Sequence, residues 1–463
     1  MSAHTLPEIY SEVEKTYRSR RRALSDQIVA DIYSNAEQLV RQVVVESPSS
    51  RRDWNMKLDD ILTSRWLGYP IMIILLSLVF WITVQGANIP SEMIATVLFA
   101  LEERLSAWFL ALGAPGWLHG VIVLGMYKTL AWVVSVMLPP MAIFFPMFTL
   151  LEDLGYLPRV SFNLDSLFKR AKACGKQALT MCMGFGCNAA GVISCRIIDS
   201  PRERLIAVLT NNFVPCNGRF PTLIIVATIF IGGTAGSAYE TAVAAAVITC
   251  LVLLGIGVTF LTSRILSATI LKGESSSLIL ELPPYRRPQF GAVVYRSVID
   301  RTLFVLMRAV VIAAPAGAIT WVLGNVYIGE LSVIGHLAGW LNPLGHAIGL
   351  DGFILLAFIL GLPANEIVLP ILLMSYLSTG HLLEFGSLEE LRSLLVINGW
   401  TWLTAVNMML FSLLHWPCAT TLLTAFKETG SKKWTFLAFI IPTVIAFAVC
   451  FLVAQSARLL GLI

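Results

Sequence analysis

Charged residues are scarce in this sequence. Asp, Glu, Lys and Arg make up 13% of the 463 residues, about half the share of a typical soluble domain, while 56% of the residues are hydrophobic. The mean hydropathy is +0.75. This composition excludes a soluble enzyme, a disordered chain and a nucleic-acid-binding protein. It indicates a protein that is dissolved mainly in lipid.

Several chemical signatures are missing as well. The sequence contains no G-x-x-x-x-G-K-[S/T] nucleotide-binding loop, and its six histidines form no metal-binding spacing. The apolar stretches hold no paired Asp, Ser/His or H-E-x-x-H arrangement, which disfavours a membrane-embedded protease. We therefore expect a protein that is not an enzyme and that binds no cofactor tightly. The charged N-terminus has no early apolar run, which argues against a cleavable signal peptide.

The charges that are present are concentrated at the beginning of the chain. Residues 1–65 hold 10 Lys/Arg and 10 Asp/Glu, which is 20 of the 62 charges. We expect residues 1–66 to form a cytoplasmic amphipathic helical segment, followed by two membrane halves, 67–275 and 276–463. The first helix of that segment has a narrow apolar stripe at helical spacing, formed by Ile28, Ile32, Ala36, Leu39, Val40 and Val43.

Seven segments are long and apolar enough to cross a bilayer, which takes about 20 residues: 68–85, 118–150, 204–231, 241–266, 303–324, 394–426 and 434–458. Residues 92–112 carry three charges in their middle, so we expect an amphipathic helix at the interface. Residues 176–195 and 351–378 are interrupted by Gly or Pro and are expected to turn back within the membrane. The predicted fold class is all-α, a polytopic membrane protein with about seven crossings and two re-entrant hairpins.

Loop charges orient these spans and reveal a repeat. Lys and Arg outnumber Asp and Glu in segments 152–204, 264–308 and 427–433, which should be cytoplasmic together with the N-terminus. The acidic segments 232–240, 325–351 and 381–391 should face outward. Each half then holds a re-entrant hairpin followed by a long broken span, in the same order and with opposite topology. Inverted repeats with discontinuous helices place a transporter's site near the bilayer midplane.

Helix-breaking residues mark four positions in these repeats. The breaks fall in "MCMGFGCNAAGV" (181–192), "VPCNGRFP" (214–221), "GLPANEIVLP" (361–370) and "HWPCATT" (415–421). Gly and Pro leave backbone carbonyls without helical partners, and such breaks are tolerated in a membrane only where they line a cavity. We call the glycines and prolines that shape the backbone at these breaks the gate backbone residues; they are Gly184, Gly186, Pro215, Pro363 and Pro417.

Each break also carries a thiol, an amide or a carboxylate. Three thiols with amide and carboxylate oxygens suit Fe²⁺, Mn²⁺ or Zn²⁺ and suit Mg²⁺ or Ca²⁺ poorly. The candidate ligands along a transport path are Cys187, Asn188, Cys216, Asn217, Asn365, Glu366 and Cys418.

These candidates have plainer alternatives. A buried Cys is often a packing residue, which is the reading we favour for Cys195, Cys250 and Cys450; for Cys182 the two readings are equal. Glu366 is costly within an apolar segment and indicates function, although it could instead pair with Arg219. Arg219 could also extend to the outer interface. His415 could line the path or lie at an interface.

The chain resembles the membrane part of the ferrous iron transport protein B family, from about residue 20 to about residue 430. The resemblance rests on five segments in order: "RRRALSDQIVADIY" (20–33), "KLDDILTSRWLGYPI" (57–71), "LEDLGYLPRVSFNLDSLF" (151–168), "GFGCNAAGV" (184–192) with "RIIDSPRERLIAVL" (196–209), and "ELPPYRRP" (281–288). It implies Fe²⁺ uptake through two gate regions coupled to GTP binding. Carried over by position, the gates are 184–188 and 215–219, with Glu366 and the Pro417–Cys418 pair in the second half. The nucleoside-transporter-like gate families share the architecture.

The sequence departs from that family in ways that shape our expectations. It has no G domain, so GTP would act only through a separately encoded small GTPase docking on residues 8–66. It has "PANE" where the family usually has "AKE", and "CNGRFP" where many members have "CGAR". We expect a multi-pass permease of the plasma (inner) membrane that carries Fe²⁺, possible as a homo-oligomer and without a nucleic-acid partner. The alternatives are Mn²⁺, Zn²⁺ or a nucleoside-like solute on the same scaffold, or a non-transporting membrane scaffold.

Overall fold

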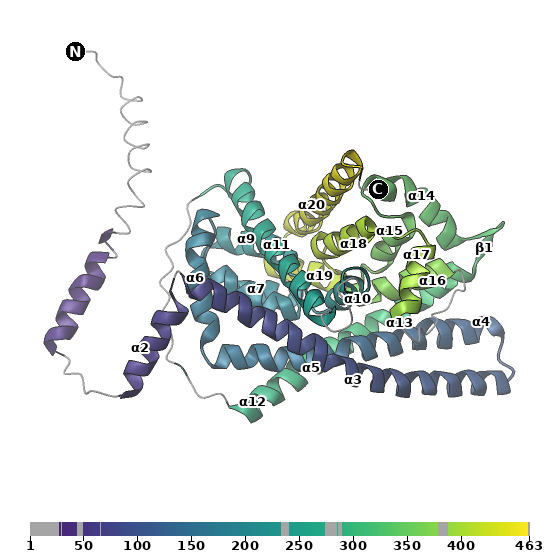
Figure 1. Cartoon of the computed structure of the whole chain (residues 1–463), viewed down its shortest axis with the longest axis horizontal. Helices are drawn as coiled ribbons and strands as arrows, with labels where there is room; N and C mark the ends of the chain where they lie inside the picture. The colour runs from purple at the N-terminus through teal and green to yellow at the C-terminus, as the bar shows by residue number, and fades with distance from the viewer. Residues whose placement is uncertain are drawn as a thin grey trace, which may run out of the picture. The chain divides into compact units, whose positions relative to one another are not determined.

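The chain forms two compact units, Met1–Asp60 and Ile61–Ile463 (Figure 1). The computed structural model describes residues 27–28, 30–43, 50–64, 66–232, 240–273, 285, 289–377 and 388–461. In the first unit, residues 30–43 are helical and the apolar stripe side chains are exposed, including Val43 at 78%. A second helix, α2, covers Ser50–Leu62, within the segment expected to be helical. The expectations for residues 8–26 and 44–49 lie outside the described residues.

Five helical segments of the described chain are long and apolar enough to cross a membrane: α3 (Gly68–Ala111), α4 (Gly116–His119) with η1 (Gly120–Tyr127) and α5 (Lys128–Asp153), α11 (Glu240–Ala268), α18 (Trp402–Leu414) with α19 (Ala419–Thr429), and α20 (Lys432–Leu459). The other two expected spans are α13 (Phe304–Asn325) and a broken segment formed by α9 (Pro201–Thr210), η3 (Asn211–Phe213) and α10 (Phe220–Phe230). The chain is therefore an all-α protein of polytopic membrane type.

Residues 92–112 do not form a helix of their own. They are the second half of α3, which runs unbroken for 44 residues past Pro90, and their expected position at the interface stays a prediction. Their charges are accommodated because Glu102 is buried and pairs with Lys128, at 3.4 Å between the carboxylate and the ammonium nitrogen. Glu103 and Arg104 lie on the exposed side of the helix.

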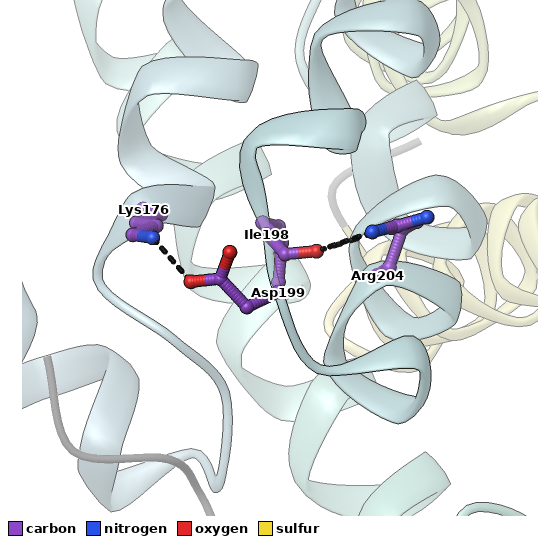
Figure 2. A network of polar contacts seen from close by, with 4 residues as sticks. All are labelled: Lys176, Ile198, Asp199 and Arg204. Atoms are coloured by element: carbon purple, nitrogen blue, oxygen red, sulfur yellow. Dashed lines mark hydrogen bonds and ion pairs between the residues drawn. The ribbon is translucent and has the colours of Figure 1, made fainter.

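Both re-entrant hairpins form, and each is closed at its open end by a polar contact. The first comprises α7 (Lys176–Gly186), α8 (Asn188–Ser194) and η2 (Cys195–Ile197). At its two ends, the Lys176 ammonium nitrogen and the Asp199 carboxylate form an ion pair at 2.6 Å (Figure 2). Beside this pair, the Arg204 guanidinium donates a hydrogen bond to the carbonyl of Ile198. The second comprises α15 (Gly352–Leu360), η6 (Asn365–Ile367) and α16 (Val368–Leu377). Here the Tyr376 hydroxyl donates to Asp351. The chain therefore enters and leaves at neighbouring positions in both hairpins.

The remaining elements connect these segments. They are α6 (Tyr156–Arg170), α12 (Phe290–Tyr295), η5 (Arg296–Leu303), the two-residue strands β1 (Tyr327–Ile328) and β2 (Leu331–Ser332), α14 (Val333–Ala347) and α17 (Leu388–Ile397). The α14–α15 pair bends by 111°, a turn that the sequence did not reveal. A core of stacked aromatic rings, including Phe80, Phe144 and Phe220, packs α3, α5 and α10 together.

Candidate metal path where four helix breaks meet

The first break separates α7 from α8 at Cys187. This residue is extended, with φ −154° and ψ 126°. The helix that precedes it ends against a ring, because a Cβ at Gly186 would lie 2.1 Å from Phe145. Only glycine fits there, so the Phe145 ring packs directly against the backbone at the end of α7.

The second break lies between η3 and α10, at residues 214–219. A tight turn follows Pro215, closed by bonds from the Arg219 and Phe220 amides to the carbonyls of Cys216 and Asn217 (2.9 and 3.2 Å). The backbone N–H of Asn217 donates to the Gly186 carbonyl at 3.4 Å, and this hydrogen bond joins the second break to the first.

The third and fourth breaks repeat this arrangement in the other half. Ala364 interrupts the second hairpin with φ −152° and ψ 121°, nearly the angles of Cys187. The break between α18 and α19 runs from His415 to Cys418. The Ala419 amide, which follows the second Pro-Cys pair, donates to the Leu362 carbonyl at 2.9 Å. Each Pro-Cys turn is thus tied to the re-entrant break of its own repeat.

Arg219 joins the two repeats. Its side chain is 1% exposed, and its guanidinium donates to the carbonyls of Leu413 at the end of α18 and of His415 and Trp416 in the fourth break (2.7–3.1 Å). It also holds the carbonyl and the side-chain oxygen of Asn212 (2.9 and 3.0 Å). The salt bridge to Glu366 is not among the ion pairs of the described residues, and Arg219 does not reach an interface. It satisfies carbonyls that the helix break leaves without partners.

A line of buried polar side chains crosses the same region. The Asn212 amide donates to the His415 carbonyl at 2.6 Å, and the His415 ring lies 3.4 Å from the Asn365 side-chain oxygen. The Asn365 amide in turn approaches the Cys216 sulfur at 3.9 Å. His415 therefore lies at the gate, 1% exposed, rather than at an interface.

The three gate thiols and the Glu366 carboxylate belong to breaks that contact one another. The Asn365 side chain approaches the Cys216 sulfur at 3.9 Å. The Glu366 carboxylate lies against the second break, since a Cβ at Gly218 would be 2.4 Å from its oxygen. Among the residues that the structure describes, no three His, Cys, Asp or Glu side chains are close enough to hold a metal ion.

The remaining candidates divide clearly. Asn188 lies at the meeting point, where its side chain contacts that of Asn212 at 3.3 Å. The Asn217 side chain points elsewhere, into a small pocket beside Phe80 and Thr83, and its nitrogen has no partner among the described residues. Cys195 and Cys450 are buried and bonded to carbonyls within the helix packing. The sequence analysis did not identify Asn212 as a site residue or Arg219 as the residue that joins the repeats. The available signal for Asn212 was the pair of amide side chains, Asn211 and Asn212, just before Pro215.

Comparison with known proteins agrees with this architecture. The Gate family, described as nucleoside recognition, matches residues 134–230 and 306–432, one segment in each half. The family described as the ferrous iron transport protein B C terminus matches residues 248–300. No solved structure gave a significant match.

Similar proteins are named Fe(2+) transporter FeoB. The Staphylococcus aureus (strain MSSA476) protein is 28% identical over 91% of this chain and 62% of its own length. The Methanocaldococcus jannaschii protein is 28% identical over 98% and 66%, and the Legionella pneumophila (strain Lens) protein is 26% identical over 94% and 64%. The chain spans somewhat less than two thirds of these curated relatives.

The fold and the four breaks define a helical membrane protein with two gate repeats. The chain is similar over 91–98% of its length to proteins named Fe(2+) transporter FeoB, and segments of it match the Gate family and the ferrous iron transport protein B C terminus.

Proposed function

We propose that this chain is a permease for a divalent transition metal, and that its substrate is Fe²⁺. The observation that carries the proposal is the junction of four contacting helix breaks, which hold Cys187, Cys216, Cys418 and the Glu366 carboxylate. A carboxylate in an apolar region is costly and is by default a candidate for a substrate path. The names of the relatives support Fe²⁺ as the substrate.

The open arrangement of these groups suits transport better than storage. Conduction needs ligands that bind strongly enough for entry and weakly enough for release. Separate thiols and one carboxylate would each supply part of the coordination shell of the ion as it moves along the path. The side-chain oxygens of Asn188 and Asn365 would be further ligands. We propose that the ion passes between the two repeats, from break to break, as the junction opens.

Uptake into liposomes of purified protein tests the proposal. Fe²⁺ is supplied under reducing conditions, with Mn²⁺ and Zn²⁺ as competitors. Cys216→Ser should lower the Fe²⁺ uptake rate, whereas Cys250→Ser should leave it unchanged, because Cys250 is exposed on α11 away from the breaks. Glu366→Gln should weaken uptake in protein that still accumulates in the membrane. Equal uptake by Cys216→Ser and Cys250→Ser would exclude Cys216 from the path.

We also propose that the N-terminus is cytoplasmic, in the plasma (inner) membrane, and that residues 8–66 dock a separately encoded small GTPase. The exposed apolar stripe on residues 30–43 supports a partner, because Leu39 and Val43 are 62% and 78% exposed. Leu39→Glu with Val43→Glu should abolish stimulation of uptake by the candidate GTPase, and Gln38→Glu on the same helix is the control. Uptake that is indifferent to the GTPase in all three proteins would contradict this step.

A second candidate substrate is a nucleoside, which the description of the Gate family favours. Its recognition would need donors and acceptors for base and ribose. The buried side-chain amides of Asn188 and Asn212 could supply such hydrogen bonds, although both already form hydrogen bonds at the helix breaks. Uptake of a radiolabelled nucleoside without metal flux would establish this reading. Absence of any flux in every arm would favour a membrane scaffold.

A further inference from the structure

A large apolar cavity lies in the first membrane half, apart from the gate junction. Its volume is about 330 Å³, and its walls come from the start of α3, from the end of α5, from α6, from α7 and from the second half of α11. Most of the side chains on its walls are Leu, Ile, Val, Met and Phe. Such a cavity between membrane helices suits a hydrocarbon chain and offers a polar solute almost nothing to bind.

The cavity opens toward the outer surface of the helix bundle. Ile73 on α3 and Leu253 on α11 both line it, and they are 41% and 39% exposed. The two helices are joined further along by a hydrogen bond between Ser77 and Thr249 at 3.1 Å. A molecule that reaches the opening from the side therefore comes from the lipid.

A glycine on α11 also lines the cavity. Gly257 lines the cavity, and a Cβ built there would meet no atom within 4 Å. The void thus extends to the helix backbone of α11, which leaves room for a chain of methylene groups along the helix.

Two exposed arginines follow residues of the cavity wall in sequence. Phe168 and Phe260 line the cavity and stack edge to face at 4.7 Å. Arg170 follows Phe168 by two residues, and Arg264 lies one turn beyond Phe260 on the same face of α11; both are exposed. Exposed cations near an apolar slot are complementary to the phosphate of a lipid whose acyl chain fills the slot.

We propose that this cavity is a binding site for one anionic phospholipid of the bilayer. One acyl chain lies between α3 and α11 against α6 and α7, and the phosphate lies near Arg170 and Arg264. The bound chain contacts Met181 and Phe185 on α7, the helix that ends at the first break. The site is independent of the substrate of the permease.

Photolabelling in lipid nanodiscs tests the proposal. The full-length protein is placed in phosphatidylcholine discs that contain a small fraction of phosphatidylglycerol with a photoreactive group on its acyl chain. Mass spectrometry then maps the labelled peptides. We expect labelling of residues 68–79, 156–168 and 253–260 above the level on the exposed, lipid-facing side chains of α20, such as Phe436 and Val444.

A cavity-filling variant provides the decisive comparison. Gly257→Leu places a side chain in the void and should reduce labelling of the cavity peptides about tenfold, which corresponds to about 1.4 kcal/mol of binding. Gly339→Leu is the matched control, because a Cβ there also meets no atom within 4 Å and the residue is exposed on α14. The labelling of α20 serves as the internal reference in every sample.

The headgroup is tested separately. Arg170→Gln with Arg264→Gln should remove the preference for labelled phosphatidylglycerol over phosphatidylcholine with the same photoreactive chain, whereas Arg392→Gln on α17 should keep it. Equal labelling of the cavity peptides in the wild type and Gly257→Leu would overturn the acyl-chain site. Equal labelling by the two lipids in the wild type would overturn the anionic specificity.

Discussion

Arg219 is the residue whose removal should disturb the junction most. Its guanidinium makes five hydrogen bonds to four carbonyls and one side-chain oxygen, from Asn212 in the first repeat and Leu413, His415 and Trp416 in the second. Arg219→Met keeps much of the side-chain volume and removes every donor. The carbonyls of two helix breaks would then be buried without partners.

The magnitude follows from these contacts. Polar interactions between membrane helices contribute about 0.6 kcal/mol each on average, so five bonds give a lower limit of about 3 kcal/mol. Breaking a buried charged network by removing one partner destabilises by about 3–5 kcal/mol. With an unfolding entropy of about 2.1 cal/mol/K per residue, a unit of roughly 400 residues loses about 5 °C in Tm for 4 kcal/mol.

Thermal unfolding in detergent, followed by size-exclusion chromatography, measures this effect. Arg219→Lys should give an intermediate loss, because one ammonium group cannot reach all five acceptors. Arg392→Met is the control, since Arg392 is exposed on α17. If Arg219→Met lowers Tm no more than Arg392→Met, the guanidinium does not hold the two repeats together.

Three further predictions concern close contacts and charge. Gly191→Ala should lower Tm by an amount equivalent to about 1–3 kcal/mol relative to Gly339→Ala, because its Cβ would lie 2.6 Å from the Asn211 amide and displace its bond to Asn188. Gly218→Ala should reduce metal uptake in protein that still accumulates, because its methyl group would push the Glu366 carboxylate aside; normal uptake would contradict this. The hydrogen bond and the charge of Lys176 lower the pKa of Asp199. The ion pair should therefore stabilise the hairpin fully at a pH above the ordinary pKa of a carboxyl group. This stabilisation should be lost as the pH falls through the lowered pKa. The difference in Tm between wild type and Asp199→Asn should therefore shrink in acid, and a constant difference would exclude the ion pair as its cause.

The parts of this fold that could be predicted are those that depend on local chemistry. Gly184, Gly186, Pro215, Pro363 and Pro417 indicate breaks because each lies at or beside a cluster of Gly, Pro and polar residues, whereas a lone proline such as Pro90 lies inside a continuous helix. The order of hairpin and broken span in each half follows from the same signals. The length and hydropathy of the remaining stretches indicate crossings.

The parts that could not be predicted depend on partners distant in sequence. Residues 92–112 were expected to form a helix of their own because the charge of Glu102 is visible in the sequence, whereas its pairing with Lys128 is not. Arg219 remained ambiguous because its partners are backbone carbonyls, which carry no sequence signature. His415 was equally open, since only the fold brings it to Asn365.

The two re-entrant breaks are alike in backbone and unlike in chemistry. The segments G-F-G-C-N (184–188) and G-L-P-A-N (361–365) place Cys187 and Ala364 at the same extended angles, each just before an Asn. Both repeats carry a Pro-Cys turn, so the first repeat offers two thiols at its breaks and the second offers one. A path built from these repeats is therefore richer in sulfur on one side.

This asymmetry gives a prediction about metal preference. Ala364→Cys introduces a thiol on a backbone that already holds a cysteine in the other repeat, so the fold should be retained. Because thiolate ligands favour Zn²⁺ over Mn²⁺ and Fe²⁺, the variant should become more sensitive to Zn²⁺ in competition with Fe²⁺ uptake. Ala364→Ser is the control of similar size. If Ala364→Cys and Ala364→Ser respond equally to Zn²⁺ while the new thiol reacts with a thiol reagent, the third break does not lie on the metal path.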